Sequence, residues 1–173
     1  MTRSLSLCVL LCALIGAPLA LGACGNDEEG SSSSSGGSDT NFGTVTLQAG
    51  FTAPHVVEGR SGGTTDASSV SAECVGTIDS TPDHALELSA AMAGLRIFAA
   101  AEEDITLVIQ KPDGSYLCND DSDGTNPMVS MESFPAGTYK IWIGNYNVEE
   151  GGAAYKLGFS TAADASPALL AEG

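Results

Sequence analysis

The stretch Ile105-Thr-Leu-Val-Ile-Gln-Lys-Pro-Asp-Gly-Ser-Tyr-Leu-Cys118 decides the fold class of this chain. Ile105, Leu107 and Ile109 alternate with their neighbours, which is the two-residue period of a β-strand with one buried face. The Lys-Pro-Asp-Gly run at 111–114 then places proline and glycine where a tight turn needs them. Because the four residues after the turn again read as a strand, the stretch predicts a β-hairpin.

Short strand patterns of the same kind recur on both sides of this hairpin. Together with it they make about eight strands, spaced about 8–15 residues apart and separated by turn residues, with no helical pattern of useful length. This pattern predicts an all-β fold, an antiparallel β-sandwich of jelly-roll type. The other expected strands are Val56–Val57, Ala85–Ser89, Leu95–Ala99, Met128–Met131, Thr138–Ile143 and Tyr155–Phe159.

The start of the chain, residues 1–23, reads as the signal peptide of a bacterial lipoprotein. Arg3 provides a basic start, and the uncharged run Leu5–Leu21 is short for a membrane span, so a secretory signal is favoured. The end of this run, Leu21-Gly-Ala-Cys24, resembles the lipoprotein box, in which the cysteine thiol accepts a diacylglyceryl group. We therefore expect Cys24 to be lipidated; the alternative is an ordinary secretory signal that leaves Cys24 as an odd thiol.

Residues 24–40 are expected to tether the lipid to a folded domain. After the cysteine the sequence is GNDEEGSSSSSGGSDT, which has no apolar side chain to offset the entropy of ordering itself. Gly/Ser-rich sequence of this kind behaves as a flexible linker. The acidic run Asp27–Glu29 is either a sorting signal or a solubilising group. The β-sandwich domain is expected to span residues 41–162 and to be followed by a disordered tail at 163–173.

The charge balance excludes one class of partner. The chain has 22 acidic residues against 6 Lys and Arg, for a formal net charge of −16. This charge repels phosphate backbones, so nucleic acid is not expected as a partner, and anionic lipid headgroups are disfavoured for the same reason. Contact with the membrane is therefore assigned to the lipid anchor rather than to the protein surface.

The five cysteines separate by region. Cys8 and Cys12 lie in the signal and Cys24 is the proposed lipid site, which leaves Cys74 and Cys118 in the exported domain. An isolated pair in an exported protein predicts a disulfide. The alternatives are a redox-active or nucleophilic cysteine, or a metal site, but the sequence has no C-x-x-C motif to favour either.

Three stretches in register carry a family resemblance. The first is Asp104–Asp121, and it is followed by Pro135-Ala-Gly-Thr-Tyr-Lys-Ile-Trp-Ile-Gly144 and Tyr155-Lys-Leu-Gly-Phe-Ser160. Together they resemble the bacterial pre-peptidase C-terminal domain over residues 54–160. The resemblance implies a jelly-roll-like accessory module without catalytic residues, associated with secretion, enzyme maturation or substrate binding. A lipoprotein signal and tether stand where a peptidase would precede the module, which speaks against a role in processing a peptidase of the same chain.

The sequence contains no recognisable catalytic set. A serine hydrolase needs a serine beside a histidine base and an orienting acid, and no G-x-S-x-G motif is present. His55 and His84 each stand near the start of an expected strand, so both are interpreted as strand-edge residues rather than bases. The zinc motif H-E-x-x-H is also absent. No enzyme activity is expected; a small secreted hydrolase remains the rival hypothesis.

The acidic loop after Cys118 is the candidate metal site. Asn119, Asp121 and Asp123 alternate before Gly124, and hard oxygen ligands suit Ca²⁺. The loop is not an EF-hand, because the twelfth position is a serine and no helices flank it. The sequence therefore predicts either a calcium site or a solvated acidic turn. The proposed ligands are Asn119, Asp120, Asp121 and Asp123.

Trp142 is the only tryptophan, and its strand determines which way it points. If Tyr139 and Ile141 face the core, Lys140 and Trp142 face the opposite side of the sheet. A tryptophan beside a lysine is a candidate platform for a sugar or a peptide. The favoured alternative is that a neighbouring loop covers the ring, with the segment Ser61–Ser71 as the candidate cover.

The sequence as a whole predicts a lipid-anchored, non-catalytic β-sandwich module of the bacterial cell envelope, facing the periplasm or the cell surface. Its expected work is to bind an envelope protein, a peptidase or an extracellular polysaccharide. A purely structural envelope lipoprotein is a further alternative. No cofactor is expected apart from the candidate calcium ion.

Overall fold

The structure is a computed structural model that describes residues 39–147 and 152–171, all within one compact unit. The expected signal peptide, the lipidation site Cys24 and all but the last two residues of the tether lie outside the described residues. Within the described ranges no helix is long and apolar enough to cross a membrane.

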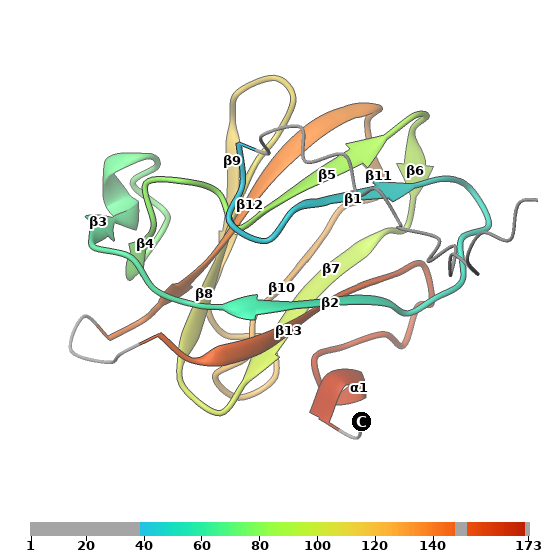
Figure 1. Cartoon of the computed structure of the whole chain (residues 1–173). Helices are drawn as coiled ribbons and strands as arrows, with labels where there is room; N and C mark the ends of the chain where they lie inside the picture. The colour runs from blue at the N-terminus through green and yellow to red at the C-terminus, as the bar shows by residue number, and fades with distance from the viewer. Residues whose placement is uncertain (1–38, 148–151, 172–173) are drawn as a thin grey trace, which may run out of the picture. The chain divides into compact units, whose positions relative to one another are not determined.

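The described residues form thirteen mostly short strands and two helical turns (Figure 1). Glycine and proline turns end several of the strands, and only five of the thirteen have six residues or more. The elements are β1 (Thr44–Leu47), β2 (His55–Arg60), β3 (Thr65–Asp66), η1 (Ala67–Ser69), β4 (Thr77–Ile78), β5 (His84–Leu88), β6 (Met92–Ala93), β7 (Arg96–Ala101), β8 (Ile105–Gln110), β9 (Tyr116–Asn119), β10 (Met128–Ser130), β11 (Ser133–Phe134), β12 (Gly137–Asn145), β13 (Ala154–Ser160) and α1 (Ala168–Ala171).

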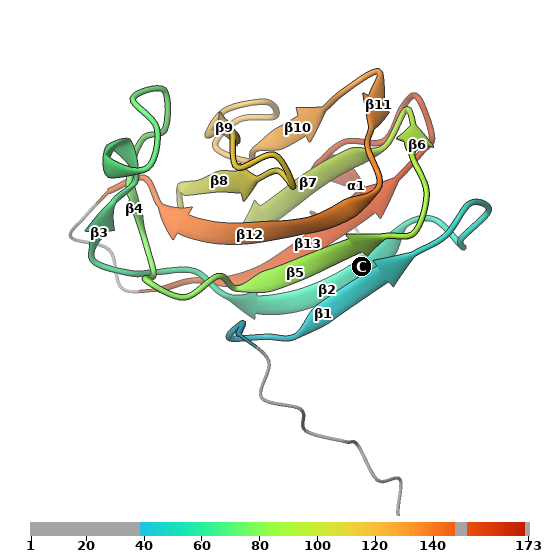
Figure 2. The ribbon, with the colours of Figure 1, turned by 90° about the horizontal axis from the view of Figure 1, so that it is seen from above.

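Two sheets pack face to face as a sandwich (Figure 2). In the seven-stranded sheet β12 is central: it pairs with β5 and then β4 on one side and with β8 on the other. The four-stranded sheet has the order β10-β7-β13-β2, and all of its pairs are antiparallel. The two sheets together confirm the predicted all-β sandwich.

All eight predicted strands are present in the structure. The 105–110 strand and the hairpin that follows it are confirmed, with β8 pairing antiparallel to β9. β1 was not expected from the sequence; it pairs parallel to β5 and is the exception to the antiparallel pattern. Several two-residue strands were not expected either, because two residues are too few to show a period.

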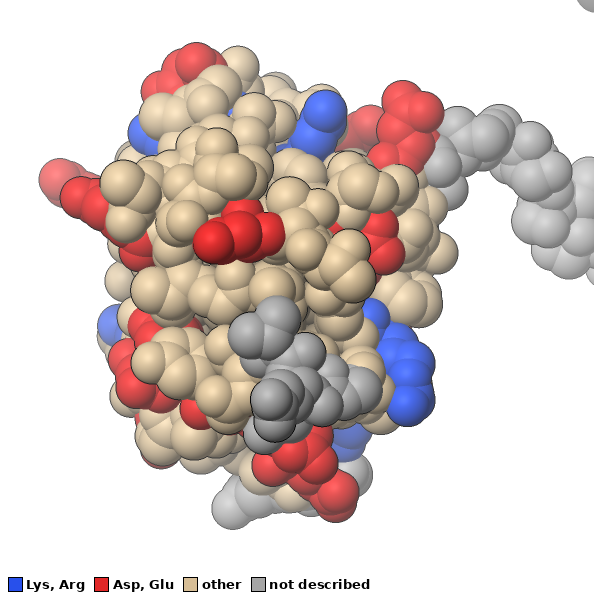
Figure 3. Space-filling model, turned by 90° about the vertical axis from the view of Figure 1, so that its left-hand side faces the viewer, with Lys and Arg blue, Asp and Glu red and all other residues tan. Residues whose placement is uncertain are grey.

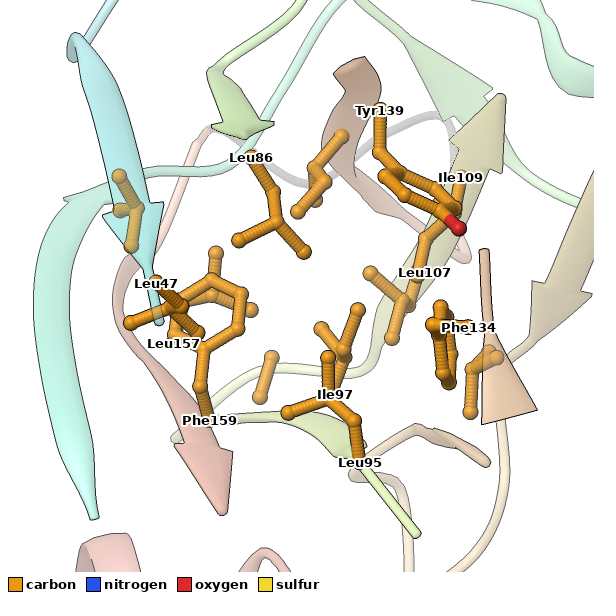
Figure 4. Packing of buried hydrophobic residues seen from close by; sticks show 14 of the residues in the cluster. Leu47, Leu86, Leu95, Ile97, Leu107, Ile109, Phe134, Tyr139, Leu157 and Phe159 are labelled. Carbon is orange, nitrogen blue, oxygen red and sulfur yellow. The ribbon is translucent and has the colours of Figure 1, made fainter. Parts of the chain in front are cut away.

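The core lies between the two sheets and takes alternate residues from each (Figure 4). On β12 the side chains of Tyr139, Ile141 and Ile143 are fully buried, which confirms the predicted inward face. Leu157 and Phe159 of β13 meet them from the four-stranded sheet. Burial of such side chains contributes about 1.5–3 kcal/mol each to the stability of the folded state.

A flap formed by residues 65–78 covers the outer face of the seven-stranded sheet. Trp142 lies beneath it, 7 % exposed, in a cluster with Ala67 and Ile78 of the flap and Val108 of β8. The covered alternative for Trp142 is therefore right, and the ligand-platform alternative is wrong for this structure. The adjacent Lys140 remains exposed, but without an accessible tryptophan ring beside it.

A disulfide fastens this flap to the sheet. Cys74 in the flap is bonded to Cys118 in β9, with their Cα atoms 5.2 Å apart. Both cysteines belong to the cluster that encloses Trp142. The predicted disulfide is thus present in the structure, and it holds the cover over the tryptophan.

The C-terminal segment corrects another prediction. The sequence predicts a disordered tail at 163–173, but Ala165 is fully buried and Leu170 is 4 % exposed. Both pack on Phe98 at the outer face of the four-stranded sheet, and Lys156 donates a hydrogen bond to the Leu170 carbonyl at 3.3 Å. Two buried apolar residues suffice to dock a segment that has no periodic pattern of its own.

Removal of the disulfide should loosen the flap before the core. We expect Cys74→Ala with Cys118→Ala to lower the free energy of unfolding by about 3–4 kcal/mol, because the bond closes a loop of 44 residues. Trp142 fluorescence should shift to the red in native buffer as the flap loses contact with the ring. Urea unfolding and emission spectra measure the two effects, and a double variant with wild-type emission would show that packing alone holds the flap.

Candidate binding site at the seam of the two sheets

The carboxylate of Asp83 organises one end of the sandwich. β5 begins at His84 and β4 meets β12 only at Asn145, so the Ile143 N–H between them has no strand partner on this side. The Asp83 Oδ2 accepts that N–H at 2.7 Å, and its Oδ1 accepts a hydrogen bond from the Asn41 side-chain amide at 3.2 Å. The side chain of Asp83 therefore joins the start of the domain to the central strand.

Burial changes the acidity of this carboxyl. Asp83 is only 3 % exposed. Desolvation raises the pKa of Asp83 to about 6, although the hydrogen bonds from Ile143 and Asn41 lower it in part. The nearby carboxylate of Asp79 adds to the increase. An acid with this pKa exchanges its proton in the mildly acidic range rather than near pH 4.

A buried histidine and tyrosine lie next to Asp83. The His84 side chain is 1 % exposed, and its Nε2 shares a hydrogen bond of 2.8 Å with the Tyr155 hydroxyl. Burial lowers the pKa of His84 to about 4 and raises that of Tyr155. At neutral pH the pair is therefore an uncharged imidazole and a protonated phenol.

The ring of Phe42 covers the His84–Tyr155 pair on its solvent side. Its ring packs edge-on against Tyr155, with centroids 6.2 Å apart and planes at 87°, and lies 5.7 Å from the His84 ring. The opposite side of Phe42 is in solvent, so that the residue is 44 % exposed. Gly59 makes this packing possible, because a Cβ there would overlap the Tyr155 hydroxyl. The result is a half-exposed aromatic ring on a rigid support.

The end of β2 is fixed beside this ring. The hydroxyl of Ser61 donates a hydrogen bond to Asn145 Oδ1 at 2.6 Å and accepts one from the Ala153 N–H at 2.9 Å. Ser61 and Asn145 are both buried. The exposed Arg60, one residue earlier, is thereby held at a defined place on the surface.

These residues enclose a pocket of about 270 Å³, here called the Phe42 pocket. Its wall combines an apolar ring, a guanidinium, an amide and two carboxyl groups. No ion pair joins Arg60 to another described residue. A concave site with one aromatic surface and a few fixed polar groups is the usual form of a small-ligand site. The side chains that define it are Asn41, Phe42, Arg60, Ser61, Asp79 and Asp83.

In the acidic loop predicted as the metal site, one of the proposed ligand oxygens is occupied by hydrogen bonds within the protein. Asn119 Oδ1 accepts hydrogen bonds from the Met128 N–H at 2.9 Å and from the Ser122 hydroxyl at 2.7 Å. Within residues 39–147 and 152–171 no three His, Cys, Asp or Glu side chains gather as a metal site. Calcium binding by Asp120, Asp121 and Asp123 stays a prediction.

The histidines begin their strands as predicted, but their surroundings differ. His55 is the first residue of β2, and its ring lies 6.2 Å from that of Phe159. His84 is the first residue of β5 and is buried rather than placed at an edge. Among the described residues, neither ring is hydrogen-bonded to a serine hydroxyl, and the buried Ser61 is hydrogen-bonded to Asn145 instead.

Sequence reasoning missed the residues of the Phe42 pocket. One signal was available: Asn41-Phe42 places the first aromatic residue directly after a tether that has no apolar side chain. The partner residues, Arg60 and Asp83, carry no such signal, because they come together only through the packing of β2 on one sheet and β5 on the other.

No family model matches this chain, and no curated protein matches it either. Among solved structures it is similar to the pre-peptidase C-terminal domain of a collagenase from Bacillus anthracis, at 13% sequence identity and a TM-score of 0.46. That similarity covers 70% of this chain and 96% of the other.

The Asp83 and His84 pKa values predict two opposing pH effects on stability. The raised pKa of Asp83 stabilises the fold below about pH 4, and this contribution is lost as the pH rises through 6. The lowered pKa of His84 stabilises the fold above about pH 6.5, and this contribution is lost as the pH falls through 4. Each amounts to about 3 kcal/mol, so they largely offset one another in the wild type.

Single variants should separate the two effects. Relative to wild type, Asp83→Asn should gain stability as the pH rises from 4 to 6.5, and His84→Gln should lose it. Urea unfolding at several pH values measures both, and the slopes are compared rather than the absolute stabilities, because each variant also loses hydrogen bonds. Slopes of the same sign in both variants would contradict the assignment.

The calcium prediction is tested by thermal unfolding of the full chain. If the loop after Cys118 binds the ion, millimolar Ca²⁺ raises the melting temperature, because the ion binds only the folded state. Asp121→Asn with Asp123→Asn should abolish this response. A wild-type melting temperature that calcium leaves unchanged would identify the loop as a solvated acidic turn.

Proposed function

We propose that this chain is a lipid-anchored, non-catalytic β-sandwich module of a bacterial cell envelope, and that it binds an extracellular polymer or a partner protein through the Phe42 pocket. One observation carries the proposal: Phe42 is 44 % exposed and stands beside the exposed Arg60 at a hollow in the surface. The two residues supply an apolar face and a charged hydrogen-bond donor at one place.

The support beneath Phe42 favours a binding role. A side chain that is already fixed before the ligand arrives loses little conformational entropy on binding. Phe42 is fixed by Tyr155 and His84 behind it and by the Phe42 N–H, which donates to the Asp83 carbonyl at 2.7 Å. An aromatic residue held in this way is the kind of anchor that contributes most at interfaces.

The position of the pocket in the chain agrees with an envelope location. Phe42 follows the end of the expected tether by two residues. A flexible Gly/Ser-rich chain of this length has a root-mean-square span of about 20–25 Å. A lipid at Cys24 would therefore keep the pocket close to the membrane surface, within reach of other envelope components.

The hydrogen bonds of the described residues favour binding over hydrolysis. The imidazole of His84 is hydrogen-bonded to Tyr155 inside the core, and burial lowers its pKa to about 4, which makes it a weaker base than an exposed histidine. Ser61, the serine that lines the pocket, donates a hydrogen bond to the side-chain oxygen of Asn145, and an amide cannot act as a base. These contacts support a structural role for both groups.

Loss of the anchor should change where the protein is found. We expect Cys24→Ala to move the chain from the membrane fraction to a soluble or unprocessed form, because the thiol that accepts the lipid is gone. Fractionation with mass spectrometry of the mature N-terminus measures this. A wild-type protein whose N-terminal cysteine carries no acyl mass would overturn the anchor.

Binding is tested with the soluble, unlipidated form of the Cys24→Ala chain and isolated envelopes. The chain should sediment with envelopes of the organism that encodes it, and adding Phe42→Leu and Arg60→Gln should reduce the bound fraction at least about tenfold, the loss of about 1.4 kcal/mol. Val75→Ala, which alters an exposed apolar residue on the flap, is the matched control and should bind normally. Equal sedimentation of all variants would rule out the Phe42 pocket as the binding site.

A further inference from the structure

We propose that the Phe42 pocket is one end of a longer groove, and that this groove binds a neutral, hydroxyl-rich polysaccharide strand. The inference rests on the proposed function and narrows its ligand. It follows from three neighbouring hollows, the mixture of charges along them and the position of the exposed aromatic residues.

The three hollows are linked by shared lining residues. Arg60 lines both the Phe42 pocket and a second hollow of about 470 Å³, which Glu102 and Ala154 also line. Glu102 and Ala154 in turn line a third hollow of about 460 Å³, which reaches Lys156 on the outer face of the four-stranded sheet. A row of hollows with common walls fits a chain-like ligand better than a compact one.

Small residues keep the groove shallow and continuous. Gly152, Ala153 and Ala154 form one wall of the second hollow, and Ala100 and Ala101 contribute to the third. None of these side chains extends beyond a methyl group. Wide rings can therefore lie along the surface without displacing large side chains.

Charges of both signs line the groove, and acids are in the majority. Each hollow combines one basic side chain with two acidic ones: Arg60 with Asp79 and Asp83 in the first, Arg60 with Glu102 and Glu103 in the second, and Lys156 with Glu58 and Glu102 in the third. Figure 3 shows acidic groups distributed over the end of the domain where β2 and β12 finish, with basic groups toward its margins. A polyanion is repelled by this acidic lining and by the net charge of −16. A polycation meets Arg60, which lines two of the three hollows, and Lys156 in the third.

A neutral hydroxyl-rich chain suits this lining. Each sugar hydroxyl can donate to a carboxylate and accept from a guanidinium or an ammonium, so both kinds of side chain contribute hydrogen bonds. Charged partners make such bonds stronger than neutral ones. The apolar faces of the sugar rings then require aromatic side chains.

The exposed aromatic residues stand at this end of the domain. Phe42 lines the first hollow. Tyr146, also 44 % exposed, follows the end of β12, and its N–H donates to the Asp104 carbonyl in the turn that supplies Glu102. Among the described residues, the large apolar side chains that are exposed elsewhere are aliphatic. Of the two exposed aromatic side chains, Phe42 therefore lies in the lining of the groove, and Tyr146 lies next to the turn that supplies Glu102.

The test is isothermal titration calorimetry of the full chain in detergent. The probes are a neutral β-glucan (laminarin), a neutral galactomannan, anionic alginate, cationic chitosan oligomers and a basic peptide. We expect at least one neutral polymer to bind, and Phe42→Leu and Arg60→Gln each to weaken it about tenfold or more. The matched controls Val75→Ala and Lys111→Gln, which lie away from the groove, should bind like wild type. Thermal unfolding confirms that each variant is folded.

Ligand length distinguishes a groove from a single pocket. Affinity for the neutral polymer that binds should increase with oligomer length, and Glu102→Gln should weaken long oligomers while leaving the shortest unchanged. Equal affinity at all lengths would overturn the groove. Binding of alginate, chitosan or the basic peptide through Phe42 and Arg60, without any neutral polymer, would overturn the polysaccharide assignment.

The results can distinguish a wrong ligand class from a wrong binding function. If no neutral polymer binds but the chain still sediments with envelopes through Phe42 and Arg60, the ligand class inferred here is wrong while the binding function stands. If protease treatment of the envelopes abolishes that sedimentation, the ligand is a partner protein and this inference is overturned as well. If sedimentation survives protease and is lost after polysaccharide digestion, the inference is supported.

Discussion

The hydrogen bond from the Ile143 N–H to the Asp83 carboxylate is the interaction on which the rest of the structure depends. β12 is the longest strand, and its partner on one side changes from β5 to β4 partway along it. The change leaves a backbone N–H that needs an acceptor inside the protein, because a buried unsatisfied donor is costly. Asp83 supplies that acceptor from the residue just before β5 begins.

The second oxygen of the same carboxylate connects the fold to the candidate site. It accepts from Asn41, and this contact holds the neighbouring Phe42 against Tyr155 and His84. One buried acid thus completes the central sheet and places the exposed ring. Burying a carboxyl costs free energy, which appears as the raised pKa of Asp83, and the hydrogen bonds from Ile143 and Asn41 offset part of that cost.

The two faces of the sandwich are covered by different means. On the seven-stranded sheet a flap with little regular structure is held by a disulfide over Trp142. On the four-stranded sheet the C-terminal segment docks through Ala165 and Leu170 without a covalent bond. In the part of the chain that the structure describes, the seam at the end of β2 combines an exposed aromatic ring and charged side chains with hollows, and this is why the proposed function is assigned there.

The sequence by itself determined the fold class, eight of the strands, the inward face of β12 and the Cys74–Cys118 pair, because these follow from local period, turn chemistry and a count of cysteines. It did not reveal β1 or the docked C-terminal segment, and the segment 61–71 that it proposed as the cover of Trp142 is only part of the flap at 65–78. Each of these features depends on which distant segment packs against the sheet. The Phe42 pocket was decided by tertiary structure alone. Phe42, Arg60 and Asp83 are far apart in the chain, and they meet because two sheets packed face to face bring the ends of β2 and β5 to the same seam. A pattern read along one strand contains no information about its neighbour across the core.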